Sequence, residues 1–266
     1  MISLLELLKE SISTPKAIIL AGAPGAGKGY VLKGLNLGGM KILNIDNIFI
    51  DKLKKANITL DLKNATPEER SAQAKEMVAA NKEFKGIIQS TIEGKEPFIL
   101  DGTAASFKQT EKLKLELEEA GYKVAMVYVY TDLERSLKQN QDRFEKSKGE
   151  DRSLAPAIVM RTWKSVTDNI EPYFNLFEPH FIAVSNTLEG DKLDKVEDII
   201  SKYLKPFDPK GTKPKTPAQL KKSEEQKAEL NATIQDMLDD EFIDEIKSYT
   251  ISKEEAQTRI NQFLKS

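Results

Sequence analysis

The chain has 266 residues, of which 39% are hydrophobic and 31% are charged, a balance typical of a globular protein rather than a disordered one. It has no cysteine and a single histidine, which excludes disulfide bonds, thiol nucleophiles and any site that needs two imidazoles. The 40 Lys and Arg residues nearly balance the 42 Asp and Glu residues, so the net charge of −2 does not indicate general binding to nucleic acid.

The first residues do not resemble a signal for export. Residues 1–12 have the pattern of a short amphipathic helix that ends before Pro15, and their apolar stretch is interrupted by Glu6 and lacks a basic leader. No stretch of the chain approaches the roughly 20 apolar residues that span a bilayer. We therefore expect a cytoplasmic protein.

Five short apolar runs follow, and segments with a helical pattern separate them. The runs are residues 16–21, 41–46, 97–101, 122–130 and 180–184. Uninterrupted apolar runs are typical of strands that are covered on both faces, as in a parallel sheet. Their alternation with helices predicts an α/β fold of three layers, in which helices cover both faces of a five-stranded parallel sheet.

Helix starts between these runs carry capping signals. Thr66 and Thr131 are each followed three residues later by Glu, which is the pattern of a capping box, and Pro67 occupies the favoured first helical position. The connection over residues 47–96 is much longer than one crossover requires, so we expect a helical cap over the carboxyl edge of the sheet. Further helices are expected over residues 107–120, 157–176 and 193–204.

The composition changes near residue 205. Residues 205–215 are rich in Pro and Lys and have no periodic apolar pattern, which is typical of an extended linker. Residues 216–266 show helix starts at Thr216 and Ser252 and hold 7 Lys and Arg against 11 Asp and Glu. This acidic helical tail is too small for a large core of its own, so we expect it to dock on the main domain of residues 1–204, on a second copy or on a partner.

The residues after the first apolar run match the phosphate-binding pattern G-x-x-x-x-G-K. Glycines let successive backbone N–H groups turn toward phosphate oxygens, and the helix that follows points its positive end at the same place. Lys28 would neutralise the β- and γ-phosphates. The predicted nucleotide-binding residues are Gly22, Ala23, Pro24, Gly25, Ala26, Gly27, Lys28, Gly29 and Tyr30. Residues 1–204 are thus expected to form a P-loop NTPase domain; a glycine-rich turn without a ligand is the alternative.

Gly29 stands where P-loops usually carry the Ser or Thr whose hydroxyl holds Mg²⁺. The sequence GAPGAGKG is similar to the loop of adenylate kinases and related nucleotide kinases, where the same Gly occurs and the metal keeps more of its water. The near match to the guanine-reading N-K-x-D pattern that starts at Asn81 lacks the Asp, so we expect ATP rather than GTP. The expected cofactors are therefore ATP and Mg²⁺.

Two carboxylates follow strands at the same predicted edge of the sheet. Asp46 ends the second run, where it can accept the proton of an attacking hydroxyl or serve only as a helix cap. Asp101 ends the third run, and we expect it to hold Mg²⁺ through water. With Thr103 these residues make up the predicted acceptor site, although a plain turn is the simpler interpretation of Asp101-Gly102-Thr103.

Arginines flank the polar stretch of residues 145–151. Arg143 and Arg152 are the best candidates for closing over the triphosphate, where they would stabilise charge on the transferring group. A solvated loop is the alternative interpretation. Trp163 and His180 are interpreted as structural residues rather than as a stacking platform and a catalytic base.

In this order the motifs resemble the zeta-toxin and polynucleotide-kinase-like group of P-loop kinases. The resemblance covers about residues 16–185 and rests on GAPGAGKG, on Asn44-Ile45-Asp46-Asn47, on Ile99-Leu100-Asp101-Gly102-Thr103 and on the arginine-bearing segment that leads to Trp163. It implies that Lys28 binds phosphates, that Asp46 is the general base and that Arg143 and Arg152 are lid arginines.

The expected activity is transfer of the γ-phosphoryl group of ATP to a hydroxyl. Because members of the resembled group act on very different hydroxyls, the acceptor stays open between a nucleotide, a nucleotide sugar, a nucleic-acid end and a modified base. The alternative is an ATP-binding assembly or regulatory protein whose acidic tail docks a partner or a second copy. We expect no membrane partner.

Overall fold

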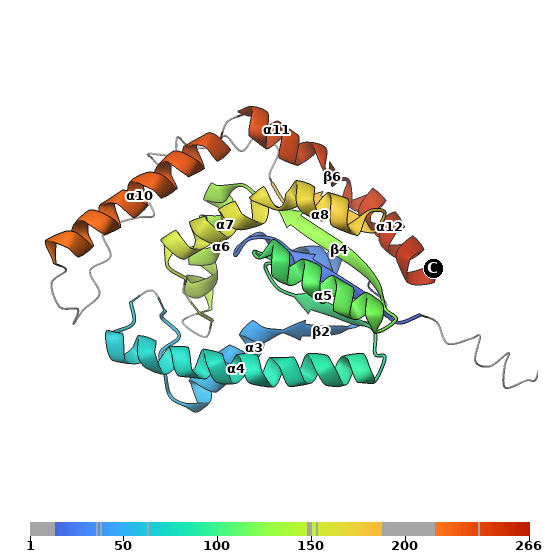
Figure 1. Ribbon diagram of the computed structural model, residues 1–266, viewed down its shortest axis with the longest axis horizontal. Coiled ribbons are helices and arrows are strands. Elements are labelled where there is room, and N and C mark those ends of the chain that lie inside the picture. Colours follow the sequence, from blue (N-terminus) through green and yellow to red (C-terminus); the bar gives the residue numbers. More distant parts are fainter. Residues whose placement is uncertain are drawn as a thin grey trace, which may run out of the picture.

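The computed structural model describes residues 14–35, 37, 39–62, 64–147, 151–152, 154–187, 216–238 and 240–266. Within them a parallel sheet has the strand order β2-β3-β1-β4-β5-β6 (Figure 1). The strands are β1 (Lys16–Ala21), β2 (Lys41–Asn44), β3 (Phe98–Asp101), β4 (Lys123–Tyr130), β5 (Phe181–Ser185) and β6 (Thr250–Ile251). The predicted α/β fold with a parallel sheet is confirmed.

Helices connect most of the strands and begin close to the predicted residues. Thr66 caps its helix with a complete capping box, and Thr216 makes the same reciprocal bonds with Gln219. Asp132 rather than Thr131 is the N-cap of the helix after β4, and it makes no side-chain cap bond. The helices are α2 (Lys28–Gly34), α3 (Ile45–Lys55), α4 (Pro67–Glu93), α5 (Phe107–Glu119), α6 (Leu133–Lys146), α7 (Pro156–Asp168), α8 (Ile170–Phe177), α10 (Pro217–Met237), α11 (Asp240–Ser248) and α12 (Lys253–Lys265). The predicted helix over 157–176 is thus divided into α7 and α8.

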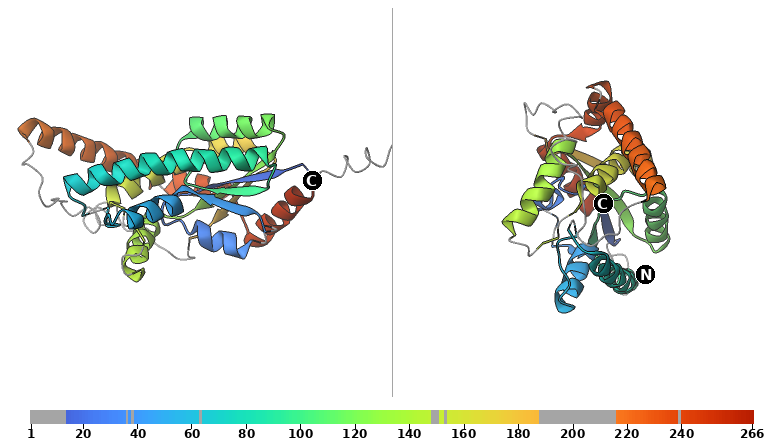
Figure 2. Two further views of the ribbon diagram at one scale, coloured as in Figure 1. Left: turned by 90° about the horizontal axis from the view of Figure 1, so that it is seen from below. Right: turned by 90° about the vertical axis from the view of Figure 1, so that its left-hand side faces the viewer.

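Apolar side chains alternate between the two faces of the sheet. Ile18 and Leu20 of β1 join the core on the face covered by α2 and α12, whereas Ala17, Ile19 and Ala21 join the core on the face covered by α5 and α8 (Figure 2, left). Because the strands between the two cores are buried on both sides, their apolar runs are uninterrupted.

The sheet has six strands rather than the five that we predicted. β6 is two residues long, and its Thr250 and Ile251 pair in parallel with Ala183 and Val184 of β5. Such a short strand has no apolar run that a sequence pattern can reveal, and its pairing depends on backbone groups alone. Through β6, a segment of the tail is therefore part of the sheet.

The last helix of the tail packs on the main domain of the same chain. Ala256, Ile260 and Phe263 of α12 are buried in the core that also contains residues of β1, β4 and β5. The ring of Phe263 lies 5.2 Å from the ring of His180 and 5.7 Å from the Nζ atom of Lys16. Helices α10, α11 and α12 follow one another along one side of the molecule (Figure 1).

The connection between β2 and β3 builds a helical layer. Helix α3 lies beside the 27-residue α4 (Figure 2), and together with the loop between them they enclose a small core of Phe49, Leu53, Leu60 and Ala80. Since α3 begins directly after β2, this layer holds the first residues of α3, including Asp46, at the end of the sheet.

Three predicted segments lie outside the described residues. They are the helices over 1–12 and 193–204 and the linker over 205–215. Within the described ranges, no helix has both the length and the apolar content needed to cross a membrane.

The packing of α12 predicts the effect of truncating one of its side chains. Phe263→Ala removes a ring that is 3% exposed, and we expect the free energy of unfolding to fall by about 3–5 kcal/mol because a cavity remains. Urea unfolding monitored by circular dichroism measures the loss. Gln262→Ala, at an exposed neighbouring position, is the control and should stay within about 0.5 kcal/mol of the original. Equal stability of the two variants would contradict the packing of α12 on the sheet.

Candidate active site

A pocket of about 980 Å³ opens at the carboxyl ends of β1, β2 and β3. Ligands of open parallel α/β sheets bind at this edge. Ten residues of its wall were predicted from the sequence as functional. Four are loop residues, namely Pro24, Gly25, Gly27 and Gly29, and six were expected to act through their side chains, namely Lys28, Asp46, Asp101, Thr103, Arg143 and Arg152. The tertiary structure therefore brings together side chains that are far apart in the chain, such as Lys28 and Arg152, which are separated by 124 positions.

The loop between β1 and α2 requires glycine at particular positions. Gly25 and Gly27 have φ angles of +79° and +80°, a region that disfavours other residues. A Cβ atom on Gly25 would lie 2.3 Å from the carbonyl oxygen of Ser136, and one on Gly27 would lie 2.1 Å from Nδ2 of Asn186. The loop is therefore packed tightly against both α6 and the segment after β5.

Hydrogen bonds fix the loop in this position. The hydroxyl of Ser136 in α6 donates to the carbonyl of Pro24, and Nδ2 of Asn186 donates to the carbonyl of Ala26 at 2.8 Å. These contacts fix the shape of the loop through the protein's own side chains. Neither anchor was predicted from the sequence, although Asn186 directly follows the last residue of β5, a position where a polar side chain reaches the same sheet edge.

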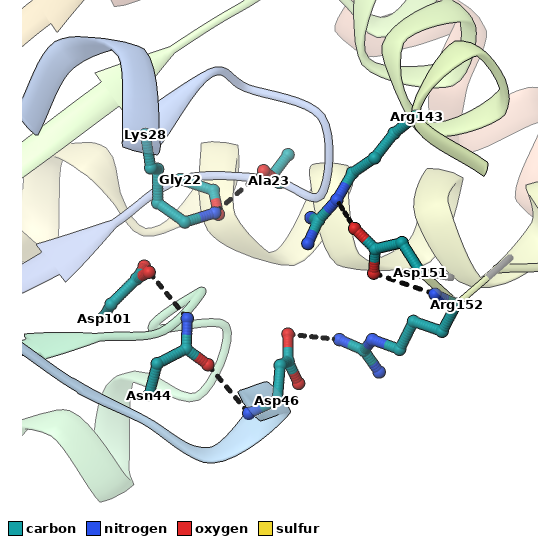
Figure 3. A network of polar contacts seen from close by, with 9 residues as sticks. All are labelled: Gly22, Ala23, Lys28, Asn44, Asp46, Asp101, Arg143, Asp151 and Arg152. Carbon is teal, nitrogen blue, oxygen red and sulfur yellow. Dashed lines mark hydrogen bonds and ion pairs between the residues drawn. The ribbon is translucent and has the colours of Figure 1, made fainter. Parts of the chain in front are cut away.

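Lys28 is partly buried, and its ammonium group lies against the loop itself. Its Nζ atom donates to the carbonyl oxygens of Gly22 at 2.8 Å and Ala23 at 3.1 Å (Figure 3). Removal from water lowers the pKa of Lys28 to about 8, while the nearby carboxylates of Asp101 and Asp46 act in the opposite direction. The side chain of Lys28 therefore loses its positive charge as the pH rises through about 8.

The two predicted carboxylates belong to one polar network (Figure 3). Nδ2 of Asn44 donates to Oδ2 of Asp101 at 2.7 Å, and Oδ1 of Asn44 accepts from the backbone N–H of Asp46 at 2.7 Å. Asn44 is the N-cap of α3, so Asp46 is a residue of the first helical turn rather than the cap itself. The side chain of Asp46 therefore has no capping role and lies on the pocket wall.

Both arginines that were predicted to close over the triphosphate form ion pairs in the structure. Arg152 bonds to Oδ2 of Asp46, and Arg143 bonds to Oδ2 of Asp151 (Figure 3). The side chain of Arg143 is 60% exposed, whereas that of Arg152 is 19% exposed. The solvated-loop interpretation does not describe Arg152, which is enclosed against a carboxylate of the pocket.

The Asp101-Gly102-Thr103 segment is held beside the phosphate loop. The carbonyl of Thr103 accepts from the backbone N–H of Gly22 at 3.2 Å. Ala104 follows with a φ angle of +51°, and its carbonyl accepts from the hydroxyl of Tyr173 at 2.6 Å. These bonds keep an unfavourable backbone conformation next to the pocket.

Three residues that the sequence analysis considered as candidates, Tyr30, Trp163 and His180, lie away from the pocket wall. Tyr30 is 64% exposed and the Nζ atom of Lys253 lies 4.8 Å from its ring centre. Trp163 is buried and donates from Nε1 to the carbonyl of Thr131 at 2.8 Å, as expected for a packing residue. His180 packs on Phe263 at the opposite end of β5.

The donor groups of the pocket fit Mg²⁺ that arrives with a nucleotide better than a resident metal. Among the described residues there is no group of three or more His, Cys, Asp or Glu that would hold a metal ion. Mg²⁺ commonly uses one or two carboxylates together with substrate phosphates and water. Asp101 and Asp46 provide carboxylates in the pocket, and Gly29 provides no hydroxyl.

The Zeta toxin family matches residues 3–186, more than half of the chain. The chain belongs to the Zeta toxin family. It is a P-loop kinase, an ATP-dependent phosphotransferase, as the resemblance of its motifs implied. None of the curated proteins compared with it matches.

The chain also matches solved structures, and the one with a TM-score above 0.5 shows a shared fold. AvrRxo1-ORF1:-ORF2 with ATP is 17% identical with a TM-score of 0.51, and the match covers 96% of this chain and 82% of that one. A structure from the PezAT chromosomal toxin-antitoxin system of Streptococcus pneumoniae is 14% identical with a TM-score of 0.46, covering 86% of this chain and 94% of that one. A gluconokinase from Sinorhizobium meliloti is 15% identical with a TM-score of 0.39, covering 72% and 90%.

The geometry of the phosphate loop predicts that its glycines are not equivalent. Gly27→Ala adds a Cβ atom against Asn186 and forces a residue with a side chain into a left-handed conformation, which costs about 1–3 kcal/mol in strain alone. We expect ATP affinity to fall at least about tenfold, as measured with a fluorescent ATP analogue. Gly29→Ala is the matched control, since a Cβ atom there meets nothing within 4 Å. Equal loss of affinity in both variants would show that packing of the loop is not the cause.

The pKa of Lys28 predicts a pH dependence of nucleotide binding. Phosphates bind the ammonium form, so the affinity for ATP should fall as the pH rises through about 8, by at most about tenfold per pH unit. At pH 8, ATP binding should take up about half a proton, which calorimetry in buffers of different ionisation enthalpy detects. Lys28→Arg keeps its charge and should lose this uptake. Identical uptake by both proteins would assign the proton to another group.

Proposed function

We propose that this kinase transfers the γ-phosphoryl group of ATP to a hydroxyl of a second substrate, with Asp46 as the general base. The observation that carries the proposal is the position of the Asp46 carboxylate in the same pocket as Lys28, close enough to affect its pKa and in contact with Arg152 (Figure 3). A base must lie within reach of the proton that it removes, and this pocket edge is where an acceptor meets a bound triphosphate.

In the proposed reaction the acceptor oxygen attacks the γ-phosphorus of ATP. A bond forms between that oxygen and phosphorus, and the bond between phosphorus and the bridging β–γ oxygen breaks, so that ADP leaves. The hydroxyl proton passes to the carboxylate of Asp46. Lys28 and the two lid arginines, Arg143 and Arg152, balance the negative charge of the phosphates and of the departing ADP.

The ion pair between Arg152 and Asp46 gives ATP a role in preparing the base. A triphosphate brings several negative charges into the pocket and competes with Asp46 for the guanidinium of Arg152. In the proposal Arg152 moves to the phosphates and its bond to Asp46 breaks, so the carboxylate becomes available to the hydroxyl. Arg143, which is more exposed, can leave Asp151 in the same way.

Asp101 is the residue that we propose to hold Mg²⁺ through water, next to the phosphate loop. The ion would neutralise phosphate charge and orient the triphosphate when bound. Gly29 cannot assist, because it has no hydroxyl. Thr103 lies on the pocket wall and is proposed to contact the acceptor.

The acceptor is proposed from the size and the chemistry of the pocket. A volume of about 980 Å³ is at the upper end of the range of about 300–1,000 Å³ found for ligand pockets, which leaves room for two substrates. The described residues of its wall include charged, amide and hydroxyl side chains but no aromatic ring. Recognition by charge and hydrogen bonds suits a polar acceptor such as a nucleotide, a nucleotide sugar, a nucleic-acid end or a modified base.

Asp46→Asn tests the proposed base. The variant keeps the shape of the side chain but accepts no proton, so transfer should fall by about 10²–10⁴-fold. ATP affinity should stay the same or increase slightly, because a negative charge leaves the pocket. Radiolabelled γ-phosphate transfer from ATP to nucleosides, nucleotide sugars and DNA and RNA ends measures the activity. The matched control is Asp51→Asn, which changes an exposed carboxylate further along α3.

Full transfer by Asp46→Asn would contradict the assignment of the base. ATP binding without transfer to any acceptor of the panel, and without release of phosphate to water, would instead favour an ATP-binding assembly or regulatory protein.

A further inference from the structure

Asn44 connects the two chain segments that carry the carboxylates of the pocket. It is the last residue of β2, and it is in register with Asp101, the last residue of the neighbouring β3. Its amide group uses both ends: Oδ1 accepts from the N–H of Asp46 and Nδ2 donates to Oδ2 of Asp101, each at 2.7 Å (Figure 3). One side chain therefore contacts both its own helix and Asp101, which lies 57 residues away from Asn44 in the chain.

Helix capping explains only half of this arrangement. An N-cap residue needs an acceptor for a backbone N–H of the first turn, and Asp or Ser serves this purpose about as well as Asn. The bond to Asp101 needs a donor as well, and it needs the reach of an amide group. Among common cap residues, Asp has no donor in its charged form and Ser has a shorter side chain. The capping role thus leaves the donor end of Asn44 unexplained.

The donor end fixes the direction of the Asp101 carboxylate. With Oδ2 bound to Asn44, the rotation of this carboxylate is restricted and its other oxygen is left for the pocket. The acceptor end fixes the backbone of Asp46 at the same time. Since small displacements of reacting groups can reduce rates by about 10²-fold, one residue that sets both carboxylates has a direct route to the reaction rate.

We propose that Asn44 is a positioning residue of the kinase, which holds Asp46 and Asp101 in the relative geometry that phosphoryl transfer requires. The inference rests on the proposed function, because it assigns a task to both carboxylates. It does not require Asn44 to touch either substrate. It predicts that kcat depends on the donor end of the amide, whereas helix stability depends on the acceptor end.

Three variants of Asn44 separate these two roles. Asn44→Ser keeps an acceptor for the cap, so urea unfolding should show stability close to the original. Asn44→Asp also keeps the acceptor, but its carboxylate faces that of Asp101, so some loss of stability is expected. Asn44→Ala removes the acceptor, so its urea unfolding midpoint should be lower than that of Asn44→Ser. All three lose the donor to Asp101, and kcat should fall about 10–100-fold in Asn44→Ser and Asn44→Ala, with the largest loss in Asn44→Asp, where a carboxylate faces Asp101.

The measurements are kcat and KM for ATP, with phosphate release to water as the assay and the best acceptor of the panel as a second assay. A loss confined to kcat, with KM for ATP within about twofold of the original, supports the positioning role of Asn44. It would show that binding of ATP is unchanged and that only stabilisation of the transition state is lost. If Asn44→Asp and Asn44→Ser keep full kcat and only Asn44→Ala is impaired in line with its lower stability, Asn44 is merely a helix cap and the inference is wrong.

The outcome for Asp46→Asn distinguishes this failure from failure of the proposed function. Inactivity of Asp46→Asn together with full activity of Asn44→Asp and Asn44→Ser refutes the positioning role and leaves the general base in place. Full activity of Asp46→Asn refutes both.

Discussion

The pairing of β3 with β1 on one side and β2 on the other is the constraint on which the pocket depends. In a parallel sheet the carboxyl ends of neighbouring strands lie at the same edge, so the phosphate loop after β1, Asp101 after β3 and Asp46 after β2 meet there. The register sets Asn44 opposite Asp101, which allows one amide to bridge them. A shift of β2 by one residue would turn these side chains to the other face and remove the network.

Opposite charges share the pocket. The ammonium of Lys28 lies on the loop carbonyls, Arg152 lies on Asp46 and Arg143 lies on Asp151. Each cation has a protein partner, which reduces the energetic cost of holding charge in a partly buried site. Each of these partnerships is weaker than one with a triphosphate, because a single carbonyl or carboxylate carries less negative charge. In the proposed reaction these partnerships therefore give way to contacts with ATP.

The tail is built into the structure that supports this pocket. Phe263 of α12 shares a core with Val31 and Leu32 of α2, the helix that begins with Lys28. β6 extends the sheet beyond β5, whose far end leads to Asn186 and the phosphate loop. A change in the packing of the tail would therefore act on the loop through buried contacts, since close-packed interiors transmit displacement.

The sequence by itself determined the local features, because they depend on neighbouring residues. The apolar runs of the strands, the capping box at Thr66 and the loop ending in Lys28 are each readable within a few positions. It could not show that Asn44 touches Asp101, that Arg152 reaches Asp46, or that Thr250 and Ile251 add a strand. Those contacts join residues distant in the chain, through side-chain amides and ion pairs in the pocket and backbone pairing in the sheet, and only the tertiary structure decides which distant groups meet.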